Sequence, residues 1–74
     1  MRIQVHYFAS IREQLGKSQE VLEFPQAPSV AEVWACVGGT EPRVLVAVNQ
    51  EYADFSVALK DGDELAFFPP VTGG

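Results

Sequence analysis

The sequence predicts a single α+β domain in which one main helix covers one face of a mixed sheet of about five strands. Three observations predict this fold. The first residues alternate between apolar and polar side chains, which is the period-2 pattern of a half-buried strand. One later stretch has apolar side chains at helical spacing, and short β-branched and aromatic runs follow it. A length of 74 residues is enough for one domain only.

The first part of the chain is expected to form two strands joined by a short helix. Residues 3–7 alternate in polarity and predict the first strand. A short helix is expected over residues 10–15, because the S-x-x-E pattern of a capping box begins at Ser10 and Gly16 can end a helix in the left-handed conformation. Residues 19–24 then form the second strand of a widened hairpin.

The main helix is expected over residues 29–37. Ser29 and Glu32 form a second S-x-x-E pattern, which marks the start of a helix. Four apolar side chains then share one stripe at i, i+3, i+4 and i+7, which predicts that this side of the helix faces the sheet. The stripe consists of Val30, Val33, Trp34 and Val37.

Three further strands complete the expected sheet. They cover residues 44–48, a short edge strand at 52–55, and 64–68. The first and last strands are apolar enough to be central, and a crossover connection allows them to pair in parallel. Because one helix covers one face only, the other face of the sheet is expected to stay open.

Composition and charge narrow the possible partners and location. Five Lys and Arg against ten Asp and Glu give a net charge of −5, which disfavours nucleic acid and anionic membranes as partners. No apolar run approaches the roughly 18 residues of a membrane span, and no signal-peptide pattern is present, so we expect a cytoplasmic protein. The acidic stretch from Glu51 to Glu64 fits a solvated face or a docking surface for a basic partner.

Side chains offer little evidence for catalysis or metal binding. No phosphate-binding glycine motif and no cluster with metal-ligand spacing occurs, so no metal site is expected. His6 is expected at the surface, and Cys36 as a small, partly buried helix residue. Asp61 and Asp63 flank a glycine, which is ordinary turn chemistry.

The end of the sequence is the most unusual part of it. We expect a domain at residues 1–68 and an extended, flexible tail at 69–74, because Pro69 and Pro70 fix an extended backbone. Residues 68–74 can span at most about 20 Å. Gly73 and Gly74 lack Cβ atoms, so they fit a narrow channel and leave the last carbonyl open to attack. A frayed terminus is the alternative interpretation.

Four sequence strings resemble the small subunit of molybdopterin synthase, the MoaD family. The resemblance covers essentially the whole chain, and its most specific part is the tail. Tyr replaces the first Phe of the family's F-F-A-x-x-R-E opening, and Thr72 stands where the family usually has a small residue. The strings are YFASIRE at 7–13, VAVN at 46–49, DGDELA at 61–66 and FFPPVTGG at 67–74.

The resemblance implies a ubiquitin-like β-grasp fold and a sulfur carrier for molybdenum cofactor biosynthesis. It implies that an E1-like activating enzyme uses ATP and Mg to adenylate Gly74, after which sulfur replaces AMP and leaves a thiocarboxylate. Val71, Thr72 and Gly73 would then enter the large synthase subunit and deliver sulfur to cyclic pyranopterin monophosphate. The chain would bind no cofactor and would not be an enzyme by itself.

A docking surface for the large subunit is expected on the open face of the sheet. Phe8 and Phe68 are out of register with the buried side chains of their strands, so both rings are expected on that face, beside Pro69 and Pro70. Tyr52 is a further candidate. A loop or the short helix covering the rings is the alternative.

Arg12 matches a basic position of the family. It is expected to pair with a partner carboxylate or, as an alternative, with an acid on its own surface. Two other functions are compatible with the tail: a thiamine-pathway sulfur carrier, and a ubiquitin-like modifier that joins Gly74 to lysines of target proteins.

Overall fold

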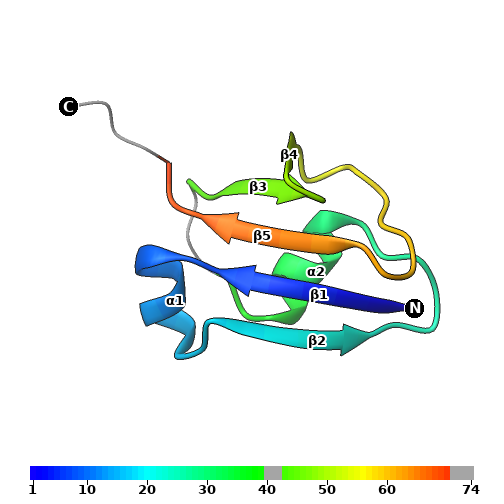
Figure 1. Cartoon of the computed structure of the whole chain (residues 1–74), viewed down its shortest axis with the longest axis horizontal. Coiled ribbons are helices and arrows are strands. Elements are labelled where there is room, and N and C mark those ends of the chain that lie inside the picture. The colour runs from blue at the N-terminus through cyan, green and yellow to red at the C-terminus, as the bar shows by residue number, and fades with distance from the viewer. Residues whose placement is uncertain (40–42, 71–74) are drawn as a thin grey trace.

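Five strands form one mixed sheet with the order β2-β1-β5-β3-β4 (Figure 1). The computed structural model describes residues 1–39 and 43–70. The sheet and the element order confirm the expected α+β fold. The strands are β1 (Arg2–Tyr7), β2 (Gln19–Glu23), β3 (Leu45–Val48), β4 (Glu51–Ala53) and β5 (Glu64–Phe68).

The two central strands run parallel, as the sequence predicted. Val5 of β1 lies opposite Leu65 of β5, while the other neighbouring pairs in the sheet are antiparallel. β4 is an edge strand but begins one residue earlier than predicted and ends at Ala53. Phe55 therefore lies outside the strand, where its half-buried side chain packs against the core.

Helix α2 (Val30–Cys36) covers one face of the sheet and lies behind it in Figure 1. The predicted capping box is present at its start. Ser29 Oγ accepts a hydrogen bond from the Glu32 N–H at 3.1 Å, and Glu32 Oε1 accepts one from the Ser29 N–H at 3.0 Å. These contacts pair two amides that a helix start leaves without partners.

Helix α1 (Ala9–Leu15) begins before the predicted residue, and the predicted capping box at Ser10 is wrong. Phe8 occupies the N-cap position, and no side chain caps the helix. The sheet fixes this start: the Phe8 N–H donates to the Phe67 carbonyl at 3.1 Å, and the Phe8 carbonyl accepts from Ile11 at 3.1 Å. The end is as predicted, because Gly16 has φ 74° and its N–H donates to the Arg12 carbonyl at 2.9 Å.

The hydrophobic core lies between the sheet and α2. The Phe67 ring lies 4.5 Å from the Trp34 ring and 6.2 Å from the Tyr7 ring, measured between centroids. Of the predicted helix stripe, Val30 and Val33 are fully buried, and Trp34 and Val37 are partly buried. The buried apolar residues are Ile3, Val5, Tyr7, Ile11, Val30, Val33, Val44, Val46, Leu59, Leu65 and Phe67.

One buried hydroxyl ties the core to the sheet edge. The Tyr7 hydroxyl donates to Glu20 Oε2 at 2.6 Å, and burial together with this hydrogen bond raises the pKa of Tyr7 above its ordinary value.

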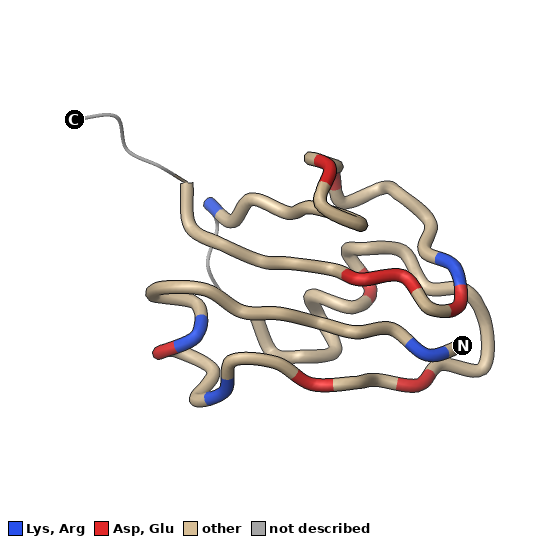
Figure 2. Tube along the Cα trace, viewed as in Figure 1, with Lys and Arg blue, Asp and Glu red and all other residues tan. Residues whose placement is uncertain are grey.

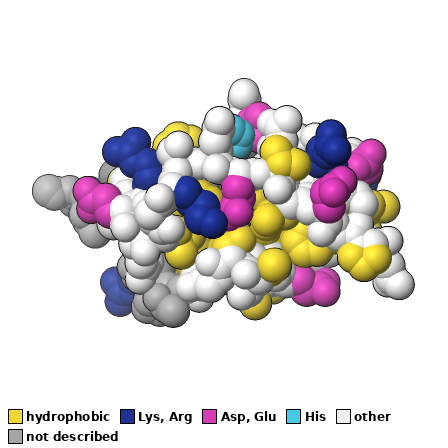
Figure 3. All heavy atoms as spheres, turned by 90° about the horizontal axis from the view of Figure 1, so that it is seen from below, with side chains coloured by type: hydrophobic (Ala, Val, Ile, Leu, Met, Phe, Trp, Pro, Cys, Tyr) yellow, Lys and Arg dark blue, Asp and Glu magenta, His cyan; other side chains and the backbone are white. Residues whose placement is uncertain are grey.

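The surface of the molecule is mixed in character. In the view from below, hydrophobic side chains are visible between charged ones (Figure 3). No helix in residues 1–39 and 43–70 is long and apolar enough to cross a membrane.

Two polar residues differ in their surroundings from what the sequence predicted. Cys36 is exposed and not partly buried, because it is the last residue of α2 and lies beside the apolar stripe. Asp63 is buried as well as being a turn residue. Its Oδ1 accepts a hydrogen bond from Asn49 Nδ2 at 2.9 Å, and its Oδ2 accepts one from the Lys60 N–H at 2.7 Å.

The Asp63 carboxylate makes the stability of the fold depend on acid pH. Burial raises its pKa, but the hydrogen bonds from Asn49 and Lys60 outweigh burial, so the pKa lies below its ordinary value. The stabilisation is therefore complete above the unfolded-state pKa of about 3.9 and is lost as pH falls through the lower folded-state pKa. We expect urea unfolding to show Asp63→Asn less stable at pH 7, with the difference from the unsubstituted chain shrinking below about pH 4. A difference that stays constant down to that pH would contradict this role.

Candidate functional site

The sheet face opposite α2 carries an apolar patch at the end where β5 finishes. We define the patch as Phe8, Leu45, Tyr52 and Phe68. The strand registers place it: Leu45 lies opposite Phe68, and their side chains point away from α2 because their neighbours Val46 and Phe67 are buried beneath the sheet. Within the described residues, no helix covers this face (Figure 1).

The patch is accessible and aromatic. The exposed fractions are 51% for Phe8 and 79% for Tyr52, whereas Phe68 is half-buried. The Tyr52 ring lies 5.9 Å from the Phe68 ring, and the Phe8 ring stacks against His6 at 6.5 Å. Exposed aromatic clusters of this kind are typical of protein interfaces. The structure thus places Phe8, Phe68 and Tyr52 together; their role in docking stays a prediction.

The patch adjoins the base of the predicted tail. The chain leaves β5 through Pro69 and Pro70, both half-buried, at the end of the sheet where β1 leads into α1 (Figure 1). The predicted tail residues Val71, Thr72, Gly73 and Gly74 lie outside the described residues. A partner that contacts the patch would therefore meet the start of the tail as well.

Arg12 lies on α1 at this same end of the molecule. Its side chain is exposed, and among residues 1–39 and 43–70 it forms no ion pair. The internal ion pair considered from the sequence is thus not found in the described part of the chain. Within the described residues, no carboxylate therefore competes with one of another molecule for an ion pair with Arg12.

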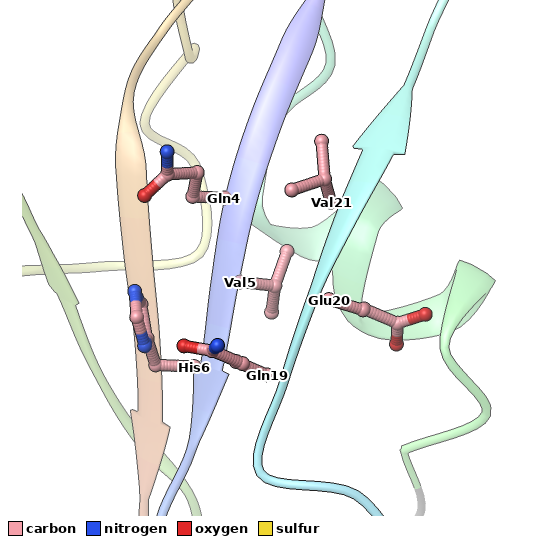
Figure 4. Close-up of a pocket in the computed structure, with 6 residues that line it drawn as sticks. All are labelled: Gln4, Val5, His6, Gln19, Glu20 and Val21. Atoms are coloured by element: carbon pink, nitrogen blue, oxygen red, sulfur yellow. The ribbon is translucent and has the colours of Figure 1, made fainter.

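A shallow hollow of about 280 Å³ lies between β1 and β2, beside the patch (Figure 4). Gln4, His6, Gln19 and Val21 line it from the open side of the sheet. His6 Nε2 is buried and lies 3.6 Å from Glu64 Oε2. The hollow contains no nucleophile with a neighbouring base, and no group of three metal-ligating side chains is found in the described residues. The hollow therefore adds polar side chains beside the apolar patch.

Leu45 is the part of the patch that the sequence did not identify. The run at residues 44–48 is apolar throughout, so it reads as a strand buried on both faces and gives no alternation. In the structure Val44 and Val46 are buried, whereas Leu45 is 37% exposed. Leu45 could have been assigned to the patch only if the register of β3 against β5, which places it opposite Phe68, had been known.

Comparisons with known proteins agree with this architecture. The model of the ThiS family matches residues 5–74. The molybdopterin synthase sulfur carrier subunits of Haemophilus influenzae and Escherichia coli are 41% and 38% identical to the chain; in each case 97% of the chain and 99% of the relative are covered. Among solved structures, SAMP1 from Haloferax volcanii superimposes with a TM-score of 0.82 at 25% identity, with both chains covered completely.

A second solved structure is a complex. The chain resembles a protein in the complex of subunits 1 and 2 of the molybdopterin-converting factor from Helicobacter pylori, with a TM-score of 0.69, 25% identity and complete coverage of both chains.

The five-stranded mixed sheet with α2 across one face, together with the likeness to SAMP1, defines a small ubiquitin-like β-grasp protein. The full-length matches narrow this class. The chain belongs to the ThiS family and, within it, to the molybdopterin synthase sulfur carrier subunits.

Proposed function

We propose that this chain carries sulfur as a thiocarboxylate on Gly74 and donates it within a molybdopterin synthase complex. The observation that carries the proposal is the combination of family membership with an accessible aromatic patch beside the base of the tail. A carboxylate is a poor electrophile, so an E1-like enzyme would first transfer AMP from Mg-bound ATP to Gly74 and release pyrophosphate. The terminal sulfur of a persulfide would then displace AMP, and a thiol would cleave the resulting acyl disulfide to leave the thiocarboxylate.

The large subunit of the synthase is the proposed recipient of the tail. Phe8, Tyr52 and Phe68 would pack against it, and Pro69 and Pro70 would direct the chain into its site. Val71, Thr72 and Gly73 would then occupy the entry channel. The sulfur would pass to cyclic pyranopterin monophosphate, with the catalytic side chains supplied by the large subunit. The proposal places this reaction in the cytoplasm and requires no cofactor on the chain itself.

Sulfur transfer in a single turnover tests this proposal. The thiocarboxylate form of the chain, mixed with the large subunit and cyclic pyranopterin monophosphate, is expected to yield a sulfur-containing pterin, whereas the carboxylate form yields none. Failure to transfer, with a large subunit active toward another carrier, would contradict the proposal. Transfer instead to a thiazole-forming enzyme would favour the thiamine-pathway alternative.

The modifier alternative has its own support in the likeness to SAMP1, whose name stands for small archaeal modifier protein 1. It predicts covalent adducts between Gly74 and lysines of other proteins when the chain is incubated with ATP and a cell extract. The sulfur-carrier proposal predicts free chain with a changed terminus under the same conditions. Immunoblotting under denaturing, reducing conditions separates the two outcomes.

The patch predicts a specific loss of affinity for the large subunit. Phe8→Ala removes a half-exposed ring from the β1 side of the proposed interface, and aromatic anchors of interfaces contribute about 2 kcal/mol or more. We therefore expect the dissociation constant to rise about 10- to 100-fold in calorimetry, with the melting temperature unchanged. Val21→Ala is the matched control, because Val21 is 54% exposed on the same face but lies on β2 at the opposite edge from Tyr52. Equal effects of the two substitutions would contradict the assignment of the patch.

A further inference from the structure

Charged side chains divide between the two ends of the sheet. The end at which β5 finishes has three of the five bases: Arg12 on α1, Lys17 before β2 and Arg43 before β3. The strand registers bring them to one end, since Leu45 lies opposite Phe68 and Gln19 lies opposite His6. Figure 2 shows the blue segments on α1, before β2 and before β3 at the end where the chain leaves β5, with a red segment beside the blue one on α1. In Figure 3 blue side chains lie toward the same end, with magenta side chains among them.

The opposite end of the sheet is acidic. Arg2 and Lys60 are the bases there, and Arg2 is paired with Glu23 at 3.5 Å. They are outnumbered by acids at the start of β5, in the turn before it and at neighbouring strand ends. These acids are Glu23, Glu51, Asp61, Asp63 and Glu64. The tail end also has acids, Glu13 beside Arg12 on α1 and Glu20 beside Lys17. Within the described residues three bases therefore meet two acids at the tail end, whereas two bases meet five acids at the other end.

Two of these bases lie on opposite sides of the tail. β5 lies between β1 and β3 in the sheet; α1, with Arg12, follows β1, and Arg43 precedes β3. Both arginines are exposed, and neither forms an ion pair within residues 1–39 and 43–70. Lys17 differs, because its Nζ lies 3.3 Å from Glu20 Oε1. Within the described residues, the unpaired bases at this end are therefore Arg12 and Arg43, and the exposed Glu13 beside Arg12 offsets part of their charge.

We propose that Arg12 and Arg43 form a basic collar that docks onto carboxylates around the opening of the large subunit that receives the tail. The inference rests on the proposed function and adds the charge of the large-subunit surface that surrounds the opening. A net negative chain is repelled by an acidic surface in most orientations, but this chain is attracted when its tail end points toward that surface. The collar thus orients the chain before contact, so that the tail meets the opening first.

The collar acts mainly on the rate of association. Rim charges change the association rate and its salt dependence more than they change the dissociation rate. Salt ions screen the interaction between protein charges beyond about 10 Å at 0.1 M salt and beyond about 3 Å at 1 M salt. The effect on the association rate is therefore expected to disappear at high salt.

A pair of double variants tests the collar. Arg12→Gln with Arg43→Gln removes two charges beside the tail, and Arg2→Gln with Lys60→Gln removes two at the far end, so both variants have the same net charge. We measure association with the large subunit by stopped-flow fluorescence at low and at 1 M salt, after thermal melts show that both variants fold. The collar variant is expected to associate about tenfold more slowly at low salt, the far-end variant no more slowly than the unsubstituted chain, and the difference is expected to vanish at 1 M salt.

Equal rates for the two variants at low salt would overturn the collar, because net charge alone would then explain them. A difference that persists at 1 M salt would also overturn it, because contact and not steering would be responsible. If the unsubstituted chain itself fails to bind the large subunit, the proposed function fails, and that result is distinct from either of these.

Discussion

Deletion of Gly74 is expected to reduce sulfur transfer to the background rate. The deletion moves the reactive carboxyl group back along the tail by one residue, which is about 3.3–3.6 Å in an extended chain. A misplacement of about 1 Å can already cost roughly 100-fold in rate, so a shift of this size leaves no productive geometry at the acyl carbon. Single-turnover assays with the activating enzyme and with the large subunit measure the two steps separately.

The fold should not respond to this deletion. Within the described residues, the buried core extends from Ile3 to Phe67. The melting temperature is therefore expected to stay unchanged. Addition of one glycine after Gly74 is the matched control, since it shifts the carboxyl group forward by the same distance, and it should be equally inactive. Full activity of the shortened chain would contradict the role of Gly74.

Two adjacent phenylalanines are expected to respond very differently to truncation. Phe67 is fully buried and packs on Trp34 and Tyr7, so Phe67→Ala should cost about 3–5 kcal/mol of unfolding free energy. Domains are stable by about 0.05–0.15 kcal/mol per residue, so this loss takes up much or all of the stability of so small a chain. Urea titration should show Phe67→Ala largely unfolded at room temperature.

Phe68→Ala is the matched partner of that variant, since it removes the same ring from the next position of β5. Phe68 points to the open face and is half-buried beside Tyr52, so its loss should cost no more than about 1 kcal/mol of stability. It should instead weaken binding to the large subunit, as Phe8→Ala does. If Phe68→Ala unfolded the chain as Phe67→Ala does, the patch would belong to the core. If its affinity stayed unchanged, the docking assignment would fail while the sulfur-carrier role would remain possible.

The same alternation explains how much of the fold could be predicted. In β1 the apolar side chains at every second position identify the buried face, and the break in that pattern at Phe8 indicates a ring on the other side. The capping box at Ser29 could be predicted because it depends on neighbours in sequence alone. The pattern at Ser10 has the same letters, but hydrogen bonds between Phe8 and Phe67 decide where that helix begins.

Features that depend on contacts between distant segments could not be predicted in this way. Leu45 joins the patch only through the register of β3 against β5, and a continuous apolar run gives no indication of it. Arg43 lies at the end of the sheet where the tail begins only because β3 starts beside the last residue of β5. Asp63 has the sequence of an ordinary turn, yet it is buried and accepts a hydrogen bond from Asn49, which lies in the turn between β3 and β4.

Intact-mass spectrometry of the chain after activation tests the central claim most directly. The chain is incubated with its activating enzyme, Mg-ATP, a persulfide donor and a thiol, and the chain lacking Gly74 is treated in parallel. We predict that the mass of the full chain rises by the difference between one sulfur and one oxygen atom, that fragmentation places the change on Gly74, and that the shortened chain stays unchanged. An unaltered full chain despite release of pyrophosphate, or sulfur located at any residue other than Gly74, would contradict the account.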